Sequence, residues 1–393
     1  KDGLRSDVIL DMDIDQYDNI WLATPSGLSK YDGRKITNYT TKDGLPTDYI
    51  HALYIDSNGI KWLMTEKGLV KFNGVDVVVY DERHGLFVNR DVGNQSALRA
   101  MYIEGGPDNK LVLGFHNIGI SIFNGSDFIN YDIDNGLIDL RIRGVDYDSE
   151  GNIWVGTEGS GVFMFDGQNF KRYTTKDGVT NDEIFHLFVD DFDKVWVGTW
   201  GGGVGFYDGE VWGSLDMRDG LIGNTISALT SSGGNTYYFA GQSVSNGISK
   251  YMPSKTSGIT QIKNVITSTK KHVYNDDMDT PNSITGNRIS FTVSASNYNT
   301  HKDKQQFRYR IKEINKKWST TTTNPVFEWV PEQAGDFHFE VQSVDRDLNY
   351  SAPVNAPFRV KYPWYKESST AIPFWGFIFL IIGFAGYSTK KYS

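Results

Sequence analysis

Residues 152–167 read NIWVGTEGSGVFMFDG, and their pattern decides how the rest of the chain is interpreted. A tryptophan in one short apolar run is followed by a Gly-Val or Gly-Leu run and an Asp-Gly or Asn-Gly pair. The pattern returns at residues 19–33, 61–74 and 194–209, and two weaker copies have Val112 and Tyr238 at the tryptophan position. A recurring unit of this kind indicates a repeat architecture in which each copy has the same fold.

A second motif, Lys-Asp-Gly-Leu or a close variant, keeps step with the first and sets the period. Its copies begin at residues 1, 42, 83, 134, 176 and 218, so the steps are 41, 41, 51, 42 and 42 residues. A period near 42 built from short β-like segments is typical of a β-propeller. We therefore predict an all-β chain whose residues 1–258 form six four-stranded propeller blades that are part of a larger set.

The second repeat shows the four expected strands of a blade most clearly, at residues 50–56, 61–65, 68–72 and 75–80. Asn-Gly and Asp-Gly pairs between the strands supply the positive φ angles that hairpin turns need. Antiparallel alternation places the turn after the second strand at the same end as the link into the next blade. Eight of the ten extra residues of the third repeat fall at this varied end, which favours a binding face there.

Two residue types in the repeats are interpreted as structural. The tryptophans recur in most copies, so we expect them to pack between neighbouring blades. His51 and His186 are taken to hold equivalent positions in their repeats.

From about residue 259 the 42-residue period stops and a different alternation begins. Phe307, Tyr309 and Ile311 alternate with polar residues, and similar short runs follow up to residue 360. About seven short strands in a hundred residues predict a β-sandwich of the immunoglobulin or fibronectin type over residues 259–366.

Residues 368–389 contain no charged side chain, and residues 371–387 are strongly apolar. Seventeen helical residues at 1.5 Å each reach roughly 25 Å, the short limit for crossing a bilayer. Lys390 and Lys391 follow directly, as the positive-inside rule favours. We expect residues 367–393 to be a transmembrane helix with a short cytoplasmic tail; the alternative is a helix buried within the protein.

The composition excludes several functions. The net charge of −9 argues against a nucleic-acid surface, and the absence of cysteine excludes disulfides and thiolate metal sites. The seven histidines show no metal-ligand spacing, and the glycines at residues 201–205 lie in a hairpin without the helix that a phosphate loop requires. We expect no metal, no cofactor and no catalytic residue in this chain.

Trp200 is the strongest candidate for ligand binding, because it occupies a turn where other repeats have small or charged residues. An exposed tryptophan can stack on a sugar ring, while polar side chains at the same varied end bind its hydroxyls. The alternative is a tryptophan folded over its own hairpin. The candidate ligand-binding residues are Trp200, Glu158, Arg141, Arg143, Arg90, Asp182, His116, Glu66 and Lys67.

The repeats resemble the two-component regulator propeller repeat, and residues 307–318 and 331–347 resemble the Y_Y_Y domain that follows such propellers. Residues 362–366, YPWYK, are similar to the family's junction ahead of its membrane helix. The resemblance implies the sensing region of a hybrid two-component receptor with an oligosaccharide ligand. It also implies an output module such as a histidine kinase outside this chain, and either further blades upstream of Lys1 or a propeller that closes differently. We expect a homodimer with a single span in the inner membrane and residues 1 to about 370 in the periplasm.

Two other functions stay open. A membrane-tethered propeller enzyme, a glycoside hydrolase or lyase, would need opposed carboxylates, for which Glu66, Glu158 and Asp182 are available. A scaffold that binds protein partners is the other alternative.

Overall fold

The computed structural model describes residues 3–87, 100–242, 247–267, 271–273, 280–297 and 299–392. The chain divides into two compact units, Lys1–Pro253 and Ser254–Ser393. Among the described residues, the first unit contains six antiparallel sheets, and the second contains two further sheets and one α-helix. The prediction of propeller-like blades followed by a sandwich is confirmed.

The six sheets of the first unit, called blades 1 to 6 below, each take their strands in chain order. Five have four strands and the last has three in the described part of the chain. The strands are β1 (Asp11–Ile14), β2 (Ile20–Thr24), β3 (Gly27–Tyr31) and β4 (Ile36–Tyr39) in blade 1; β5 (Ile50–Ile55), β6 (Lys61–Thr65), β7 (Gly68–Phe72) and β8 (Val77–Tyr80) in blade 2; β9 (Ala100–Gly105), β10 (Leu111–Phe115), β11 (Gly119–Phe123) and β12 (Phe128–Tyr131) in blade 3; β13 (Ile142–Tyr147), β14 (Ile153–Thr157), β15 (Val162–Phe165) and β16 (Phe170–Tyr173) in blade 4; β17 (Ile184–Val189), β18 (Val195–Thr199), β19 (Val204–Tyr207) and β20 (Trp212–Leu215) in blade 5; and β21 (Ile226–Ser231), β22 (Tyr237–Gly241) and β23 (Gly247–Tyr251) in blade 6.

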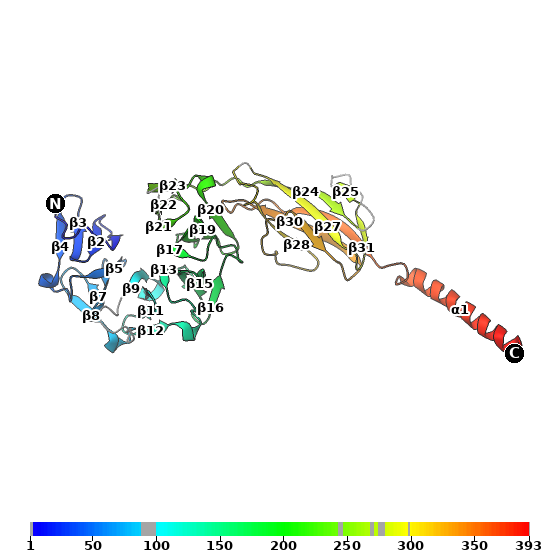
Figure 1. Cartoon of the computed structure of the whole chain (residues 1–393), viewed down its shortest axis with the longest axis horizontal. Coiled ribbons are helices and arrows are strands. Elements are labelled where there is room, and N and C mark those ends of the chain that lie inside the picture. Colours follow the sequence, from blue (N-terminus) through cyan, green and yellow to red (C-terminus); the bar gives the residue numbers. More distant parts are fainter. Residues whose placement is uncertain are drawn as a thin grey trace. The chain divides into compact units, whose positions relative to one another are not determined.

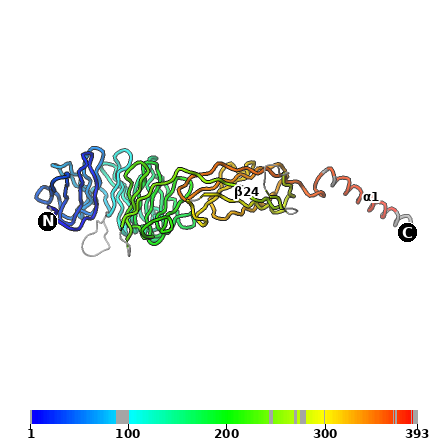
Figure 2. The backbone as a smooth tube through the Cα atoms, turned by 90° about the horizontal axis from the view of Figure 1, so that it is seen from above, coloured from blue at the N-terminus to red at the C-terminus, as the bar shows by residue number. Residues whose placement is uncertain are grey.

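The blades follow one another around an arc, with their first strands on its inner side (Figure 1; Figure 2 gives the view from above). Each first strand contacts the first strand of the next blade, from β1 and β5 through to β17 and β21. Between blades 1 and 2, Trp21 and Leu28 pack against Leu53, Leu63 and other buried residues of blade 2. The expected role of the repeated tryptophan in packing between blades is therefore confirmed.

A repeated hydrogen bond explains why an aspartate precedes each tryptophan by six residues. The indole Nε1 of Trp21 donates to Asp15 (2.7 Å), and the carboxylate of Asp15 also accepts from the backbone N–H groups of Tyr17 and Asn19 in the turn. One carboxylate thus satisfies both the turn and the buried indole. The same bond joins Trp62 to Asp56 and Trp154 to Asp148.

The Lys-Asp-Gly-Leu motif forms a capped 3-10 turn between blades. The Thr40 side chain accepts from the Lys42 backbone N–H, while the Asp43 carboxylate accepts from the Thr40 N–H. Gly44 follows at φ +95°, a conformation that glycine adopts without a Cβ clash, and Leu45 is buried. The motif therefore turns the chain from the last strand of one blade to the first strand of the next.

The end blades expose apolar positions that the inner blades bury. Met12 in blade 1 is 58% exposed, whereas Leu53 at the equivalent position of blade 2 is 4% exposed. Ile248 in blade 6 is 72% exposed, whereas its counterpart Leu28 is fully buried. Each blade therefore has one apolar face for the preceding blade and one for the following blade.

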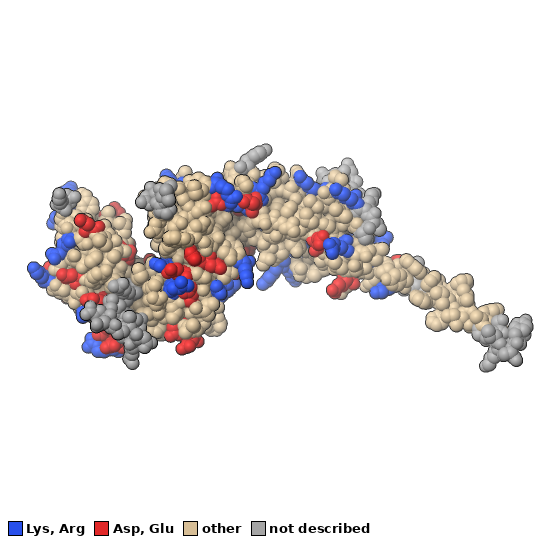
Figure 3. Space-filling model, in the orientation of Figure 1, with Lys and Arg blue, Asp and Glu red and all other residues tan. Residues whose placement is uncertain are grey.

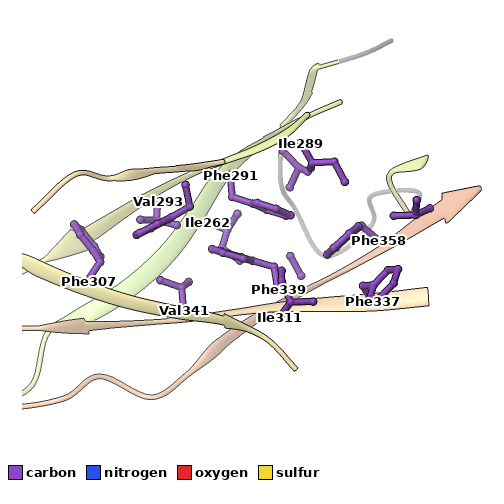
Figure 4. Packing of buried hydrophobic residues seen from close by; sticks show 14 residues of the cluster. Ile262, Ile289, Phe291, Val293, Phe307, Ile311, Phe337, Phe339, Val341 and Phe358 are labelled. Carbon is purple, nitrogen blue, oxygen red and sulfur yellow. The ribbon is translucent and has the colours of Figure 1, made fainter. Parts of the chain in front are cut away.

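The second unit is a β-sandwich of two four-stranded sheets, with orders β25-β24-β27-β29 and β26-β31-β30-β28. Aromatic side chains from both sheets meet between them, among them Phe291 and Phe339, whose rings stack at 4.0 Å (Figure 4). The strands are β24 (Ile259–Ile266), β25 (Lys271–Val273), β26 (Asn282–Ile284), β27 (Ile289–Ser296), β28 (Gln306–Ile311), β29 (Val326–Trp329), β30 (Gly335–Val344) and β31 (Val354–Lys361).

The C-terminal helix α1 (Ser368–Tyr392) contains Pro373 and carries exposed apolar side chains such as Phe377, Phe379 and Phe384. Within the described part of the chain these side chains are therefore not buried. Among the residues described, no helix reaches the length and apolarity needed to cross a membrane.

Candidate functional site

A β-bulge at the start of the first strand shapes the varied end of five blades. In blade 5, Ile184 pairs with Thr199 and His186 pairs with Gly198, so Phe185 has no partner in the ladder. A bulge re-aims the extra side chain because that residue leaves the regular pleat. The same irregularity occurs at His51, Met101, Arg143 and Ser227 in blades 2, 3, 4 and 6.

The turn after the second strand of each blade lies beside this bulge. The backbone N–H of Glu158 donates to the carbonyl of Arg141, and that of Trp200 donates to the carbonyl of Glu183, both at 3.0 Å. Glu183 in turn forms a bridge with Glu158 of the preceding blade. The expectation that these turns and the links into the next blade share one end is confirmed.

Five side chains form a continuous row across blades 3, 4 and 5, called the rim row below. Arg143 donates to Glu158 through Nε (3.0 Å) and Nη2 (2.5 Å), and His116 Nε2 lies 3.7 Å from the same carboxylate. The guanidinium of Arg143 lies 5.6 Å from the Phe185 ring centre, and that ring is 5.1 Å from Trp200. The rim row is His116, Glu158, Arg143, Phe185 and Trp200.

The rim row combines a charged pair with an aromatic pair, in which Trp200 is exposed and Phe185 is half-buried. Hydrogen bonds from Arg143 lower the pKa of Glu158, so the carboxylate is ionised at neutral pH. Trp200 packs on Phe185 of its own blade yet is 53% exposed, and its carbonyl accepts from Asn181 Nδ2 (2.5 Å). The site therefore presents an aromatic face beside fixed hydrogen-bonding groups.

The structure brings five of the predicted site residues together. Trp200, Glu158, Arg143 and His116 belong to the rim row, and Arg141 adjoins it through a backbone bridge with His116. The Arg141 guanidinium is paired with the buried carboxylate of Asp139 at 3.1 Å.

The remaining predicted residues lie elsewhere or outside the description. Asp182 accepts from the backbone N–H of Thr175 and lines a hollow of about 400 Å³ with Arg172, Lys176 and other residues. Glu66 and Lys67 lie in the turn of blade 2, where Glu66 accepts from Thr47. Arg90 is outside the described residues.

Phe185 is the member of the rim row that the sequence did not single out. Its position 42 residues after Arg143 is the signal that could have identified it, because both occupy the bulge of their blades.

The expected equivalence of His51 and His186 is wrong. His51 is a bulge residue, whereas His186 occupies the paired position that Ala52 holds in blade 2. Burial lowers the pKa of His186 to about 4, so its imidazole is neutral.

Carboxylates on the inner strands tie neighbouring blades together. Asp146 accepts from the backbone N–H of Val189 in the next blade (2.7 Å), and Asp11 and Asp13 accept from the N–H groups of Leu53 and Ile55. Burial raises the pKa of Asp146 to about 7 and that of Asp11 to about 6. Glu104 lies near Asp146, and burial together with the charge of Asp146 raises its pKa well above the usual value. Within the described parts of the chain, no group of three or more His, Cys, Asp or Glu residues could hold a metal ion.

Comparison with protein families identifies two domains in this chain. Residues 136–159 match the two component regulator propeller family, and residues 299–361 match the Y_Y_Y domain family. The chain therefore carries a two component regulator propeller repeat followed by a Y_Y_Y domain.

Solved structures with similar folds include two extracellular domains and an enzyme. The extracellular domain of BT4673 from B. thetaiotaomicron, assigned to a one component system, is 17% identical with a TM-score of 0.49, over 92% of this chain and 57% of that chain. The extracellular domain of BT3049 from the same organism, assigned to a hybrid two component system, is 16% identical with a TM-score of 0.44, over 91% and 56%. Virginiamycin B lyase from Staphylococcus aureus is 15% identical with a TM-score of 0.49, over 64% and 87%. This chain thus spans little more than half the length of the two extracellular domains, and no curated protein matches it.

Proposed function

We propose that this chain is the ligand-sensing region of a membrane-anchored two-component receptor and that it binds an oligosaccharide at the rim row. The matches to the two component regulator propeller and Y_Y_Y families support the sensing role. The observation that carries the ligand assignment is the exposed Trp200, packed on the half-buried Phe185, beside the charged pair of Arg143 and Glu158.

The chemistry of a sugar fits this combination of side chains. One face of a pyranose ring presents C–H groups that pack on an aromatic ring, and the hydroxyls around its edge both donate and accept hydrogen bonds. A guanidinium supplies only donors and an ionised carboxylate only acceptors, so the Arg143–Glu158 pair serves both roles. Because Arg143 and Glu158 hold each other, the two groups are ordered before a ligand arrives.

The same proposal assigns roles to the second unit. The sandwich, paired with its twin in a homodimer, passes the change on to α1, which anchors the receptor in the inner membrane. The support for this anchor is the sequence, in which residues 371–387 are apolar and uncharged and are followed by Lys390 and Lys391. Residues 1 to about 370 are then periplasmic. A ligand can shift such a relay only by binding one of its two states more tightly than the other.

Replacing Trp200 by alanine is expected to weaken oligosaccharide binding by about 30-fold, equivalent to roughly 2 kcal/mol for a central aromatic contact. The measurement is calorimetric titration of the full chain in detergent with the best ligand from a broad oligosaccharide panel. Phe192→Ala is the matched control, because Phe192 is 67% exposed in the turn between β17 and β18, at the other end of blade 5.

Equal losses in the two variants would contradict a specific role for Trp200. If the unmodified chain binds no oligosaccharide in the panel, the ligand assignment fails. Slow conversion of a bound oligosaccharide to product, lost in Glu158→Gln, would instead support the enzyme alternative.

The anchoring role of α1 predicts that the full chain floats with phosphatidylcholine vesicles in a density gradient. Arginine in place of both Phe379 and Ile382 is expected to release the chain, because each arginine near a helix centre costs about 2.5–3.5 kcal/mol on insertion scales. Phe192→Arg is the control and should float. An unmodified chain that stays at the bottom of the gradient contradicts the anchor.

A further inference from the structure

The bulge residues and the turn residues form pairs with a constant spacing. In each of blades 2 to 6, the last regular ladder pair at the varied end joins residues fifteen positions apart, as Ile184 and Thr199 do in blade 5. The residue after the first member of this pair is the bulge residue, and the residue after the second member is the turn residue. The bulge residue and the turn residue are therefore also fifteen positions apart. The pairs are His51 with Glu66, Met101 with His116, Arg143 with Glu158, Phe185 with Trp200, and Ser227 with Gln242.

We propose that these five pairs are a recognition row, with two side chains per blade, that determines which oligosaccharide the propeller accepts. The proposal deepens the function proposed above and rests on it. Its ligand is a linear, uncharged oligosaccharide that lies across neighbouring blades.

The first support is the contrast between the pairs and the residues next to them. The residue directly before the bulge is a buried isoleucine in four blades, at Ile50, Ile142, Ile184 and Ile226. The residue directly before the turn residue is a buried threonine in three blades, at Thr65, Thr157 and Thr199. The fold therefore dictates the paired positions, whereas the bulge and turn positions hold a cation, an anion, an aromatic ring, a thioether or a hydroxyl.

The second support is that the paired residues of blades 4 and 5 touch. Arg143 and Glu158 form an ion pair within blade 4, and Phe185 and Trp200 are in ring contact within blade 5. Neighbouring pairs also meet, because His116 approaches Glu158 and Arg143 lies over Phe185. A linear ligand that spans these blades would contact one pair after another, so that each pair would recognise a different part of it.

The third support concerns charge and favours an uncharged ligand. Arg143 is neutralised by Glu158, and the adjoining Arg141 is neutralised by Asp139. Acidic and basic side chains are also intermingled on the face drawn in Figure 3. An acidic sugar would have to compete with these carboxylates for the guanidinium groups, whereas neutral hydroxyls bind both partners of each ion pair.

The test exchanges pairs between blades and measures preference rather than affinity alone. One variant carries Phe185→Ser with Trp200→Gln, which gives blade 5 the pair of blade 6; the other carries Ser227→Phe with Gln242→Trp. The full chain is titrated with linear glucose, mannose and xylose hexamers of different linkage and with a galacturonate hexamer. Both variants are expected to change the ratio of affinities among the neutral hexamers by about tenfold or more.

The controls keep the outcomes separate. Phe192→Ser, at the opposite end of blade 5, should leave the preference unchanged, and Met101→Ala tests the row with a smaller change at a residue that is 43% exposed. An unchanged order of preference in every pair variant, with binding still lost in Trp200→Ala, overturns the recognition row and leaves the proposed function standing. Tightest binding of the galacturonate hexamer overturns the uncharged ligand, and an unmodified chain that binds none of the sugars overturns both proposals.

Discussion

Replacing Asp190 by alanine is expected to lower the free energy of unfolding of the first unit by roughly 3–5 kcal/mol, because buried donors lose their partner. Asp190 accepts from Trp196 Nε1 (2.7 Å) and from the Tyr237 hydroxyl of the next blade (2.6 Å). Both donors belong to side chains that are at most 1% exposed. The same carboxylate also accepts from two backbone N–H groups of its turn, so one substitution disturbs the turn, the blade and the contact with blade 6.

The measurement is urea denaturation followed by tryptophan fluorescence. Asp191→Ala is the matched control, because the Asp191 carboxylate is next to Asp190 in the sequence but is exposed. Removing it should change the free energy of unfolding by less than about 0.5 kcal/mol. Equal denaturation midpoints for the two variants would show that the Asp190 network contributes little to the stability of the propeller.

Replacing Asp146 by asparagine is expected to stabilise the first unit at pH 8 and to have little effect at pH 4. Burial raises the pKa of Asp146 from 3.8 to about 7, so the folded state holds the proton more tightly than the unfolded state does. The stability that protonation provides is fully present below about pH 3.8 and is lost as the pH rises to about 7. Asparagine keeps an oxygen acceptor for the Val189 N–H and carries no charge at any pH.

The expected gain at pH 8 is roughly 2–4 kcal/mol, since a shift of one pKa unit corresponds to 1.36 kcal/mol. Glu104 on β9 and Asp148 after β13 lie near Asp146, and a negative charge on either carboxylate disfavours ionisation of Asp146. Thermal unfolding at intervals from pH 4 to pH 8 measures the difference.

Asp166→Asn is the control, because backbone hydrogen bonds lower the pKa of that exposed carboxylate, and its variant should gain no stability with rising pH. A gap between Asp146→Asn and the unmodified chain that stays constant across this range would contradict the raised pKa.

The blade strands could be predicted from the sequence because their signals are local. Alternating apolar residues and Gly-containing turns place β6 at Lys61–Thr65 and β7 at Gly68–Phe72, where they were expected. Periodicity also identified Trp21 and its counterparts as packing residues, since a side chain that recurs in each blade serves the contact that recurs with it.

The candidate site was only partly predictable. Turn residues such as Trp200 and Glu158 stand out because they break the pattern of their repeat. Phe185 does not stand out, because its place in the bulge depends on a register shift between two paired strands. His51 and His186 were matched wrongly for the same reason: one residue of slip moves a side chain from the ladder to the bulge.

The sequence by itself determined the repeat period, the strands and the change from propeller to sandwich, because turn chemistry and alternation act within a few residues of the chain. Only the tertiary structure decided which apolar positions become core, since Met12 and Leu53 hold the same place in their blades, but Leu53 packs against blade 1 and is buried whereas Met12 is exposed in this structure. It also decided that one side chain in each of blades 2 to 6 leaves the ladder at the end where the turn residue lies. Bulges and burial arise from pairing between segments, and pairing is a property of the folded chain rather than of any single stretch of it.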